Sequence, residues 1–146
     1  MEVRTKLNNK RMKYTLSALH ELFYEELAKL KDEVGEITDD GIYLLKNSGS
    51  VTRVLGHDNN GVLYIGQGQI FSNTGSRVGM LINSINGTDD KHDGGVRYRN
   101  HLMDKFPLEN LIVEIEFMEN SRSGEVILLS EYMDKFGELP PLNRSS

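Results

Sequence analysis

The sequence contains no cysteine and no tryptophan, and only three of its 146 residues are proline. Without cysteine the chain has no disulfide framework, no thiolate zinc site and no cysteine nucleophile. No stretch approaches the roughly 18 consecutive apolar residues that a transmembrane helix needs. The basic N-terminus also lacks the apolar core of a secretory signal, and acidic residues soon follow it. These absences predict a cytoplasmic protein without a membrane-spanning segment.

Basic residues are also scarce, since 17 Lys and Arg face 22 Asp and Glu and give a net charge of −5. Taken alone, this charge argues against a strongly basic nucleic-acid binder. The deficit is uneven, however, because residues 107–146 hold 3 basic and 8 acidic side chains, whereas the first 13 residues hold 5 basic and 1 acidic. A basic arm and a nearly neutral middle segment therefore remain available to a polyanion.

What is present is an ordinary folded composition, with 38% hydrophobic and 27% charged residues. The length fits one domain, large enough to bury a core without a structural metal. The strongest helix signal lies near the N-terminus, where one apolar stripe runs along Met12, Leu16, Leu19, Phe23, Leu27, Leu30 and Val34. We interpret residues 1–38 as an N-terminal amphipathic helix extension. The stripe packs on the domain, or alternatively binds a protein partner or a second copy in a homodimer.

Residues 39–146 show a mixed pattern of strands and helices. Strand-like runs are found at 41–45, 61–66 and 111–118, with a further small strand within 51–55. Helices are indicated at 77–85, 95–106 and from Ser121 or Ser123 to Phe136. For the last helix, the expected apolar face carries Val126, Leu129 and Met133, and a serine hydroxyl is the expected N-cap. The fold class is therefore α+β, with a small three-stranded antiparallel sheet flanked by helices and preceded by the N-terminal helix.

The residues suited to chemistry follow these elements in order. The first strand carries Gly41-Ile42-Tyr43 and the second carries Tyr64-Ile65-Gly66, so antiparallel pairing can place both tyrosines on one face. Arg77 begins the next helix, and its planar, permanently charged group suits a phosphate. Glu125 stands at the start of the last helix in the pattern E-x-x-L-L-x-x-Y. Asn143 is the last residue of the segment FGELPPLN.

In this order and spacing, the five elements resemble the GIY-YIG nuclease family over residues 39–144. His92, in His-Asp-Gly-Gly, is similar to the His-x-x-Gly element of its restriction-enzyme-like members. The resemblance implies an endonuclease that hydrolyses phosphodiester bonds with one divalent ion, Mg²⁺ or Mn²⁺. The expected substrate is DNA, with RNA not excluded. Twenty residues separate Tyr43 from Tyr64, which indicates an insertion at about 47–60 that decorates the first hairpin.

Roles for these residues follow from what phosphodiester hydrolysis requires. Glu125 is the expected metal ligand, since one carboxylate suits Mg²⁺, and Arg77 would contact the non-bridging phosphate oxygens. Tyr43 or Tyr64 would act as general base, and the sequence does not choose between them. His92 could relay the proton, and Asn143 would hold the site's geometry or a substrate phosphate.

Two alternatives remain open at this point. Glu131 lies twelve residues before Asn143 and competes with Glu125 as the metal ligand, but polar residues follow it where Leu128, Leu129 and Tyr132 follow Glu125. The second alternative is a catalytically inactive module of the same fold that binds nucleic acid or protein. Specificity would come from the 47–60 insertion, the basic arm, a dimer or a partner.

Overall fold

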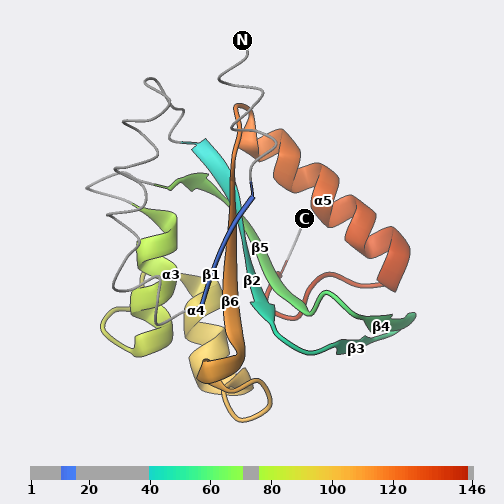
Figure 1. Cartoon of the computed structure of the whole chain (residues 1–146), viewed down its shortest axis with the longest axis horizontal. Helices are drawn as coiled ribbons and strands as arrows, with labels where there is room; N and C mark the ends of the chain where they lie inside the picture. Colours follow the sequence, from blue (N-terminus) through green and yellow to red (C-terminus); the bar gives the residue numbers. More distant parts are fainter. Residues whose placement is uncertain (1–10, 16–39, 71–75, 145–146) are drawn as a thin grey trace.

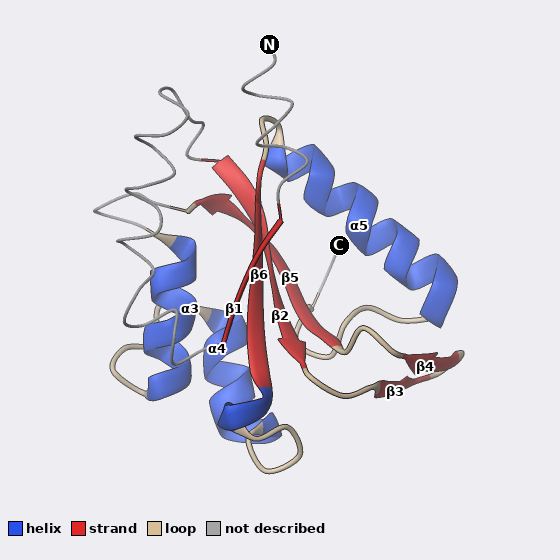
Figure 2. Ribbon diagram, in the orientation of Figure 1, coloured by secondary structure: helices blue, strands red, loops and turns tan. Residues whose placement is uncertain are grey.

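The computed structural model describes residues 11–15, 40–70 and 76–144, which form a twisted sheet with helices on both faces (Figures 1 and 2). The strands are β1 (Arg11–Thr15), β2 (Asp40–Asn47), β3 (Val51–Arg53), β4 (Gly56–Asp58), β5 (Val62–Gln69) and β6 (Leu111–Phe117). The helices are α3 (Arg77–Asn86), α4 (Asp93–Arg97), which continues into a π-helical turn at Tyr98–Leu102, a 3-10 turn at Leu108–Asn110, and α5 (Ser121–Phe136).

The main sheet is antiparallel and has the strand order β1-β6-β2-β5, while β3 and β4 form a separate hairpin. Helices α3 and α4 lie on one side of the sheet and α5 lies on the other (Figure 1). The fold is therefore α+β, as the sequence predicts, and the three expected strands correspond to β2, β5 and β6. Strand β5 continues to Gln69, three residues beyond the predicted run.

The fourth strand, β1, corrects the expected start of the N-terminal helix. The predicted apolar stripe begins at Met12, but residues 11–15 instead pair with β6, from Arg11 opposite Glu116 to Thr15 opposite Ile112. The backbone of β6 offers hydrogen bonds on this side that a helix could not satisfy, so sheet pairing overrides the helical pattern. Most of the predicted extension, residues 16–38, lies outside the described residues.

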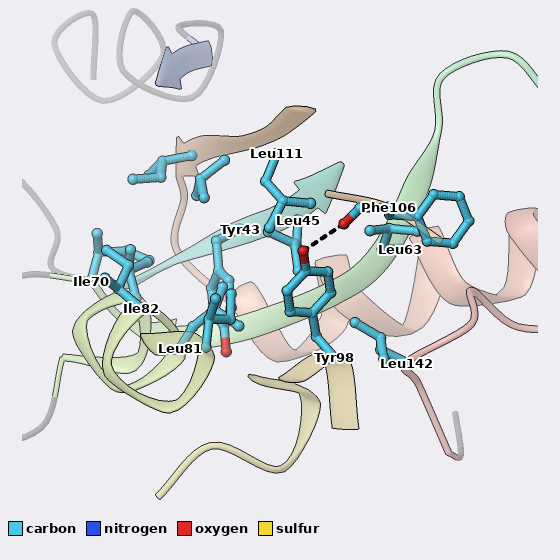
Figure 3. Close-up of a cluster of buried hydrophobic side chains, with 14 of the residues drawn as sticks. Tyr43, Leu45, Leu63, Ile70, Leu81, Ile82, Tyr98, Phe106, Leu111 and Leu142 are labelled. Carbon is cyan, nitrogen blue, oxygen red and sulfur yellow. Dashed lines mark hydrogen bonds between the residues drawn. The ribbon is translucent and has the colours of Figure 1, made fainter. Parts of the chain in front are cut away.

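Alternating side chains of the strands form two apolar clusters, one on each face of the sheet. Tyr43 and Leu45 face the cluster that α3 covers, and Ile42 and Leu44 face α5. Figure 3 shows the first cluster, in which the buried Tyr98 hydroxyl donates a hydrogen bond of 2.5 Å to the Phe106 carbonyl oxygen. Burial on both faces fixes the register of β2, because a shift by one residue would exchange the two sets.

Helix α5 differs from the sequence prediction in its cap and in its packed face. Asn120 occupies the N-cap position without a side-chain hydrogen bond, and the Ser121 hydroxyl instead donates to Gln67 Oε1 at 3.0 Å. The buried face carries Leu129, Tyr132 and Phe136, whereas Val126 and Met133 are 52% and 41% exposed. Of the expected face, Leu129 is confirmed as buried, while Val126 and Met133 are wrong because the helix is rotated so that Tyr132 and Phe136 meet the sheet.

The β3–β4 hairpin is the predicted insertion between β2 and β5, and it is joined to the C-terminal end of α5. Arg53 forms an ion pair of 2.8 Å with Glu138 and donates to the Leu139 carbonyl oxygen at 2.6 Å. The Tyr132 hydroxyl donates to Asp58 Oδ2 at 3.0 Å. The hairpin and α5 therefore form one connected unit on the right of Figure 1.

Candidate active site

Tyr43 and Tyr64 lie on the same face of the sheet, as the sequence predicts. The register places Tyr43 opposite Gly66 and Leu45 opposite Tyr64, and the two tyrosine ring centroids are 6.0 Å apart. A Cβ atom at Gly66 would lie 2.4 Å from Tyr43 Cζ and 2.7 Å from Tyr64 Cε2. Glycine is therefore required at this position because both rings lie against its backbone. Tyr43 is fully buried, while Tyr64 is partly exposed.

His92 joins this pair from the loop that precedes α4. Its Nε2 lies 2.8 Å from the Tyr43 hydroxyl oxygen, and its ring centroid is 5.0 Å from that of Tyr64. Its Nδ1 accepts a hydrogen bond of 3.1 Å from the Gly95 backbone N–H, so His92 is also the side-chain N-cap of α4. Since Nδ1 accepts, the proton of the neutral ring resides on Nε2, which donates to Tyr43.

The neutral state of His92 follows from its surroundings. The side chain is fully buried, and burial lowers the pKa of His92 to about 4, with a further lowering contribution from the Arg77 charge. Its backbone N–H donates to Ser84 Oγ at 3.0 Å, and the Ser84 hydroxyl donates to Asp89 Oδ1 at 3.0 Å. The loop between α3 and α4 thus holds the imidazole in one orientation.

Arg77 is the first residue of α3, whose N-cap is Ser76. A Cβ atom at Gly68 would lie 2.7 Å from Arg77 Cγ, which shows that the arginine side chain passes directly over β5. Burial is the main cause that raises the pKa of both Tyr43 and Tyr64, and the Arg77 guanidinium opposes this rise in each case. The Arg77 charge therefore favours the ionised form of both phenols.

Glu125 approaches the same place from the opposite face of the sheet. Its side chain is partly buried, and its carboxylate makes no hydrogen bond or ion pair with the residues that the structure describes. Burial raises the pKa of Glu125, while the charges of Arg122 and Arg77 lower it. The Glu125 charge in turn raises the pKa of Tyr64. The alternative carboxylate, Glu131, is exposed on α5.

Asn143 uses both polar atoms of its amide to hold the C-terminal segment on β5. Its Oδ1 accepts from the Ile65 N–H at 3.0 Å, and its Nδ2 donates to the Ile65 carbonyl oxygen at 2.9 Å. The Leu142 N–H also donates to the Leu63 carbonyl oxygen at 2.9 Å. These bonds flank Tyr64, so Asn143 acts on the geometry of this strand rather than presenting its amide to a ligand.

The structure also brings two arginines to this region that the sequence did not single out, Arg97 and Arg144. The pKa of Arg97 is lowered by burial and by the Arg144 charge, and the charge of Tyr64 acts on it in the opposite sense. Arg97 is the last residue of α4, and Arg144 directly follows Asn143. In the sequence, the signal for these two arginines is that each lies a few positions from a predicted site residue. Such proximity along the chain does not predict that the two side chains are neighbours.

The oxygen donors around Glu125 decide which kind of metal site it could form. Within residues 11–15, 40–70 and 76–144, no three His, Asp or Glu side chains gather into a multi-ligand metal site. A single carboxylate is nevertheless a common protein contribution to Mg²⁺, which keeps several waters and binds substrate phosphate. The partly buried Glu125 carboxylate, with no partner among the described residues, fits this kind of site.

Comparisons with known proteins found no match: no family model, no curated protein and no solved structure is similar to this chain. In the described part of the chain, no helix combines the length and apolar character needed to cross a membrane.

Proposed function

We propose that this protein is a divalent-metal-dependent endonuclease of the GIY-YIG type that hydrolyses phosphodiester bonds of DNA. The observation that supports the proposal is the convergence of five candidate residues from five segments. Tyr43, Tyr64 and His92 are in direct contact, and Arg77 acts on all three. Glu125 acts on Tyr64 and is itself influenced by Arg77. A collection of unrelated surface and core residues would not share these interactions.

In the proposed reaction, a water molecule attacks phosphorus while Tyr64 Oη accepts its proton. A new P–O bond forms, one P–O ester bond breaks, and the departing sugar oxygen keeps the electron pair and takes a proton from solvent. Arg77 contacts the non-bridging oxygens and stabilises the charge that develops on them. Glu125 would hold Mg²⁺ or Mn²⁺, which supplies Lewis-acid stabilisation of the leaving oxygen when bound.

Tyr64 suits the role of general base better than Tyr43. Tyr43 is fully buried and accepts a hydrogen bond from His92, which leaves its own proton free to be donated onward. Hydrogen bonding with Tyr43 lowers the pKa of Tyr64, against the main effect of burial, which raises it. In the proposed reaction, the Tyr43 hydroxyl, which accepts from His92, donates to the phenolate that forms at Tyr64.

Cleavage of plasmid and oligonucleotide DNA is the direct test. The wild-type protein is expected to cut in the presence of Mg²⁺ or Mn²⁺, and EDTA should abolish cutting until the ion is restored in excess. Arg77→Ala and Glu125→Gln should each lower the rate about 100-fold or more, the usual effect of removing one charge-stabilising group.

Glu131→Gln is the matched control for the Glu125 variant, because it makes the same change at the exposed alternative carboxylate. It should cut at the wild-type rate. Retention of cutting in Glu125→Gln, with loss in Glu131→Gln, would reverse the assignment of the metal ligand. Absence of cutting by the wild-type protein across DNA and RNA substrates and a panel of divalent ions would contradict the enzyme and favour a binding module.

A further inference from the structure

Arg97 and Arg144, which have no part in the proposed reaction, lie on two segments that contact β5 at Tyr64 or next to it. Arg97 is placed by α4, because Gly94 of this helix lies against the Tyr64 ring. A Cβ atom at Gly94 would be 2.9 Å from that ring. Arg97 is three residues further along the same helix and therefore lies on the same face. The Tyr64 charge influences the pKa of Arg97, in accordance with this placement.

Arg144 is brought to the same place by the C-terminal segment. The residue before it, Asn143, is bonded to both backbone polar groups of Ile65, and Leu142 is bonded to Leu63. The segment is thereby fixed along β5 on both sides of Tyr64. Arg144 is exposed, so its guanidinium is accessible to a ligand at this position.

Neither guanidinium forms an ion pair with any residue that the structure describes. Arg53 and Arg99, by contrast, are paired with Glu138 and Asp90 at 2.8 and 2.9 Å. Asp93 is the acidic group whose charge raises the pKa of Arg97, but it lies beyond ion-pair distance. The Arg144 charge nevertheless opposes that of Arg97, and an anion bound between the two removes this cost.

We propose that Arg97 and Arg144 form a binding subsite for a backbone phosphate of the nucleic acid, adjacent to the phosphate that is cut at Tyr64 and Arg77. This inference rests on the proposed function for the identity of the anion. A phosphodiester chain presents phosphates at regular intervals, so a strand held with one phosphate at Arg77 would carry the next toward a second cationic site. Arginine is well suited to both, because its planar group bonds phosphate oxygens in pairs.

The salt dependence of DNA binding tests this subsite without requiring cleavage. The probe is a fluorescein-labelled DNA duplex, titrated with full-length Glu125→Gln protein without divalent ions at several salt concentrations. Each phosphate contact contributes about 0.9 to the slope of log Kd against log salt. Adding Arg97→Ala and Arg144→Ala should therefore reduce the slope by about 1.8, and the Kd ratio between 200 and 50 mM salt by about twelvefold.

Lys105→Ala with Lys135→Ala, in the same parent, is the charge-matched control and should leave the slope unchanged. Arg144 is exposed, so Arg144→Gln removes no packed side chain. This single variant should reduce the slope by about 0.9. An unchanged slope in the double arginine variant, or an equal reduction in the lysine control, would overturn the subsite.

The outcome is separable from that of the proposed reaction. If the double arginine variant reduces the slope but the wild-type protein cuts no substrate, the phosphate subsite stands and the nuclease proposal is refuted. Cutting by the wild-type protein with an unchanged slope in the double arginine variant would do the opposite.

Discussion

At the scale of the residue, His92 illustrates how one side chain serves two structural purposes. Its Nδ1 caps α4, and its Nε2 contacts Tyr43. The cap determines which nitrogen carries the proton, and that proton determines the direction of the hydrogen bond to Tyr43. The backbone of α4 therefore sets the direction of the hydrogen bond between His92 and Tyr43.

Removal of the two phenolic hydroxyls should have unequal effects. If Tyr64 is the general base, Tyr64→Phe should lower the cleavage rate at least about 100-fold, whereas Tyr43→Phe, which loses only a supporting hydrogen bond, should lower it about tenfold. Single-turnover cleavage with Mg²⁺ measures both rates. The remaining activity of Tyr43→Phe should require a higher pH, because Tyr64 then lacks a donor that lowers its pKa. A larger loss in Tyr43→Phe would exchange the two roles.

Protonation of His92 should make the stability of the protein depend on pH. The pKa of His92 is about 4 in the folded protein and 6.5 in the unfolded chain, so the unfolded chain binds more protons between these values. The stabilisation is complete above pH 6.5 and is lost as the pH falls toward 4, by on the order of 3 kcal/mol. Urea unfolding at pH 7.5 and 4.5 measures this change. The His92→Gln variant should lose markedly less stability over the same interval, and an equal loss would refute the assignment.

At the scale of the element, α5 is the component that connects the hairpin to the sheet and carries Glu125 toward β5. Its buried face, Leu129, Tyr132 and Phe136, fixes the rotation of the helix about its axis. Since Glu125 is one turn before Leu129, this rotation also determines where the carboxylate lies. Packing far from Glu125 thus sets its position relative to Tyr64.

Two apolar truncations on α5 distinguish its packed face from its exposed one. Leu129→Ala removes a side chain that is 1% exposed and should lower the free energy of unfolding by about 2–5 kcal/mol. Met133→Ala removes one that is 41% exposed and should change it by less than about 1 kcal/mol. Urea denaturation measures both. Similar losses in the two variants would place α5 in a different rotation.

The elements were predictable where local pattern and tertiary contacts agree. The helix at Arg77 and the strand at Leu111 have one apolar face each, and the structure confirms them as α3 and β6. On α5, however, apolar residues occupy two overlapping faces, and only the sheet beneath decides between them. The sequence order of the motifs singled out Tyr43, Tyr64, Arg77, His92 and Glu125 as candidates. The effect of the Arg144 charge on Arg97, by contrast, depends on how the chain folds and has no sequence pattern.

At the scale of the whole molecule, the acidic balance is compatible with a local cationic site. The net charge is −5, yet Arg77 and Arg97 act on Tyr64, Arg144 acts on Arg97, and none of the three forms an ion pair with a described residue. Among the described residues, Arg122 is a further cation in this region, since its charge lowers the pKa of Glu125. The protein would therefore hold nucleic acid through a small number of contacts and not through a broad basic surface.

This charge distribution predicts weak DNA binding with a shallow salt dependence. Three phosphate contacts give a slope of about 2.7 for log Kd against log salt. Fluorescence anisotropy with the Glu125→Gln protein between 50 and 200 mM salt measures the slope. A value above about 5 would indicate a larger basic interface and contradict the three-arginine description.

The C-terminal segment has a further consequence for the behaviour of the protein in concentrated solution. Strand β5 is at one edge of the main sheet, where unpaired backbone groups invite pairing with a strand of another molecule. The Asn143 amide occupies the N–H and carbonyl of Ile65, and Leu142 occupies the carbonyl of Leu63. The same few residues that position Tyr64 therefore also protect this edge against intermolecular β-sheet formation and aggregation.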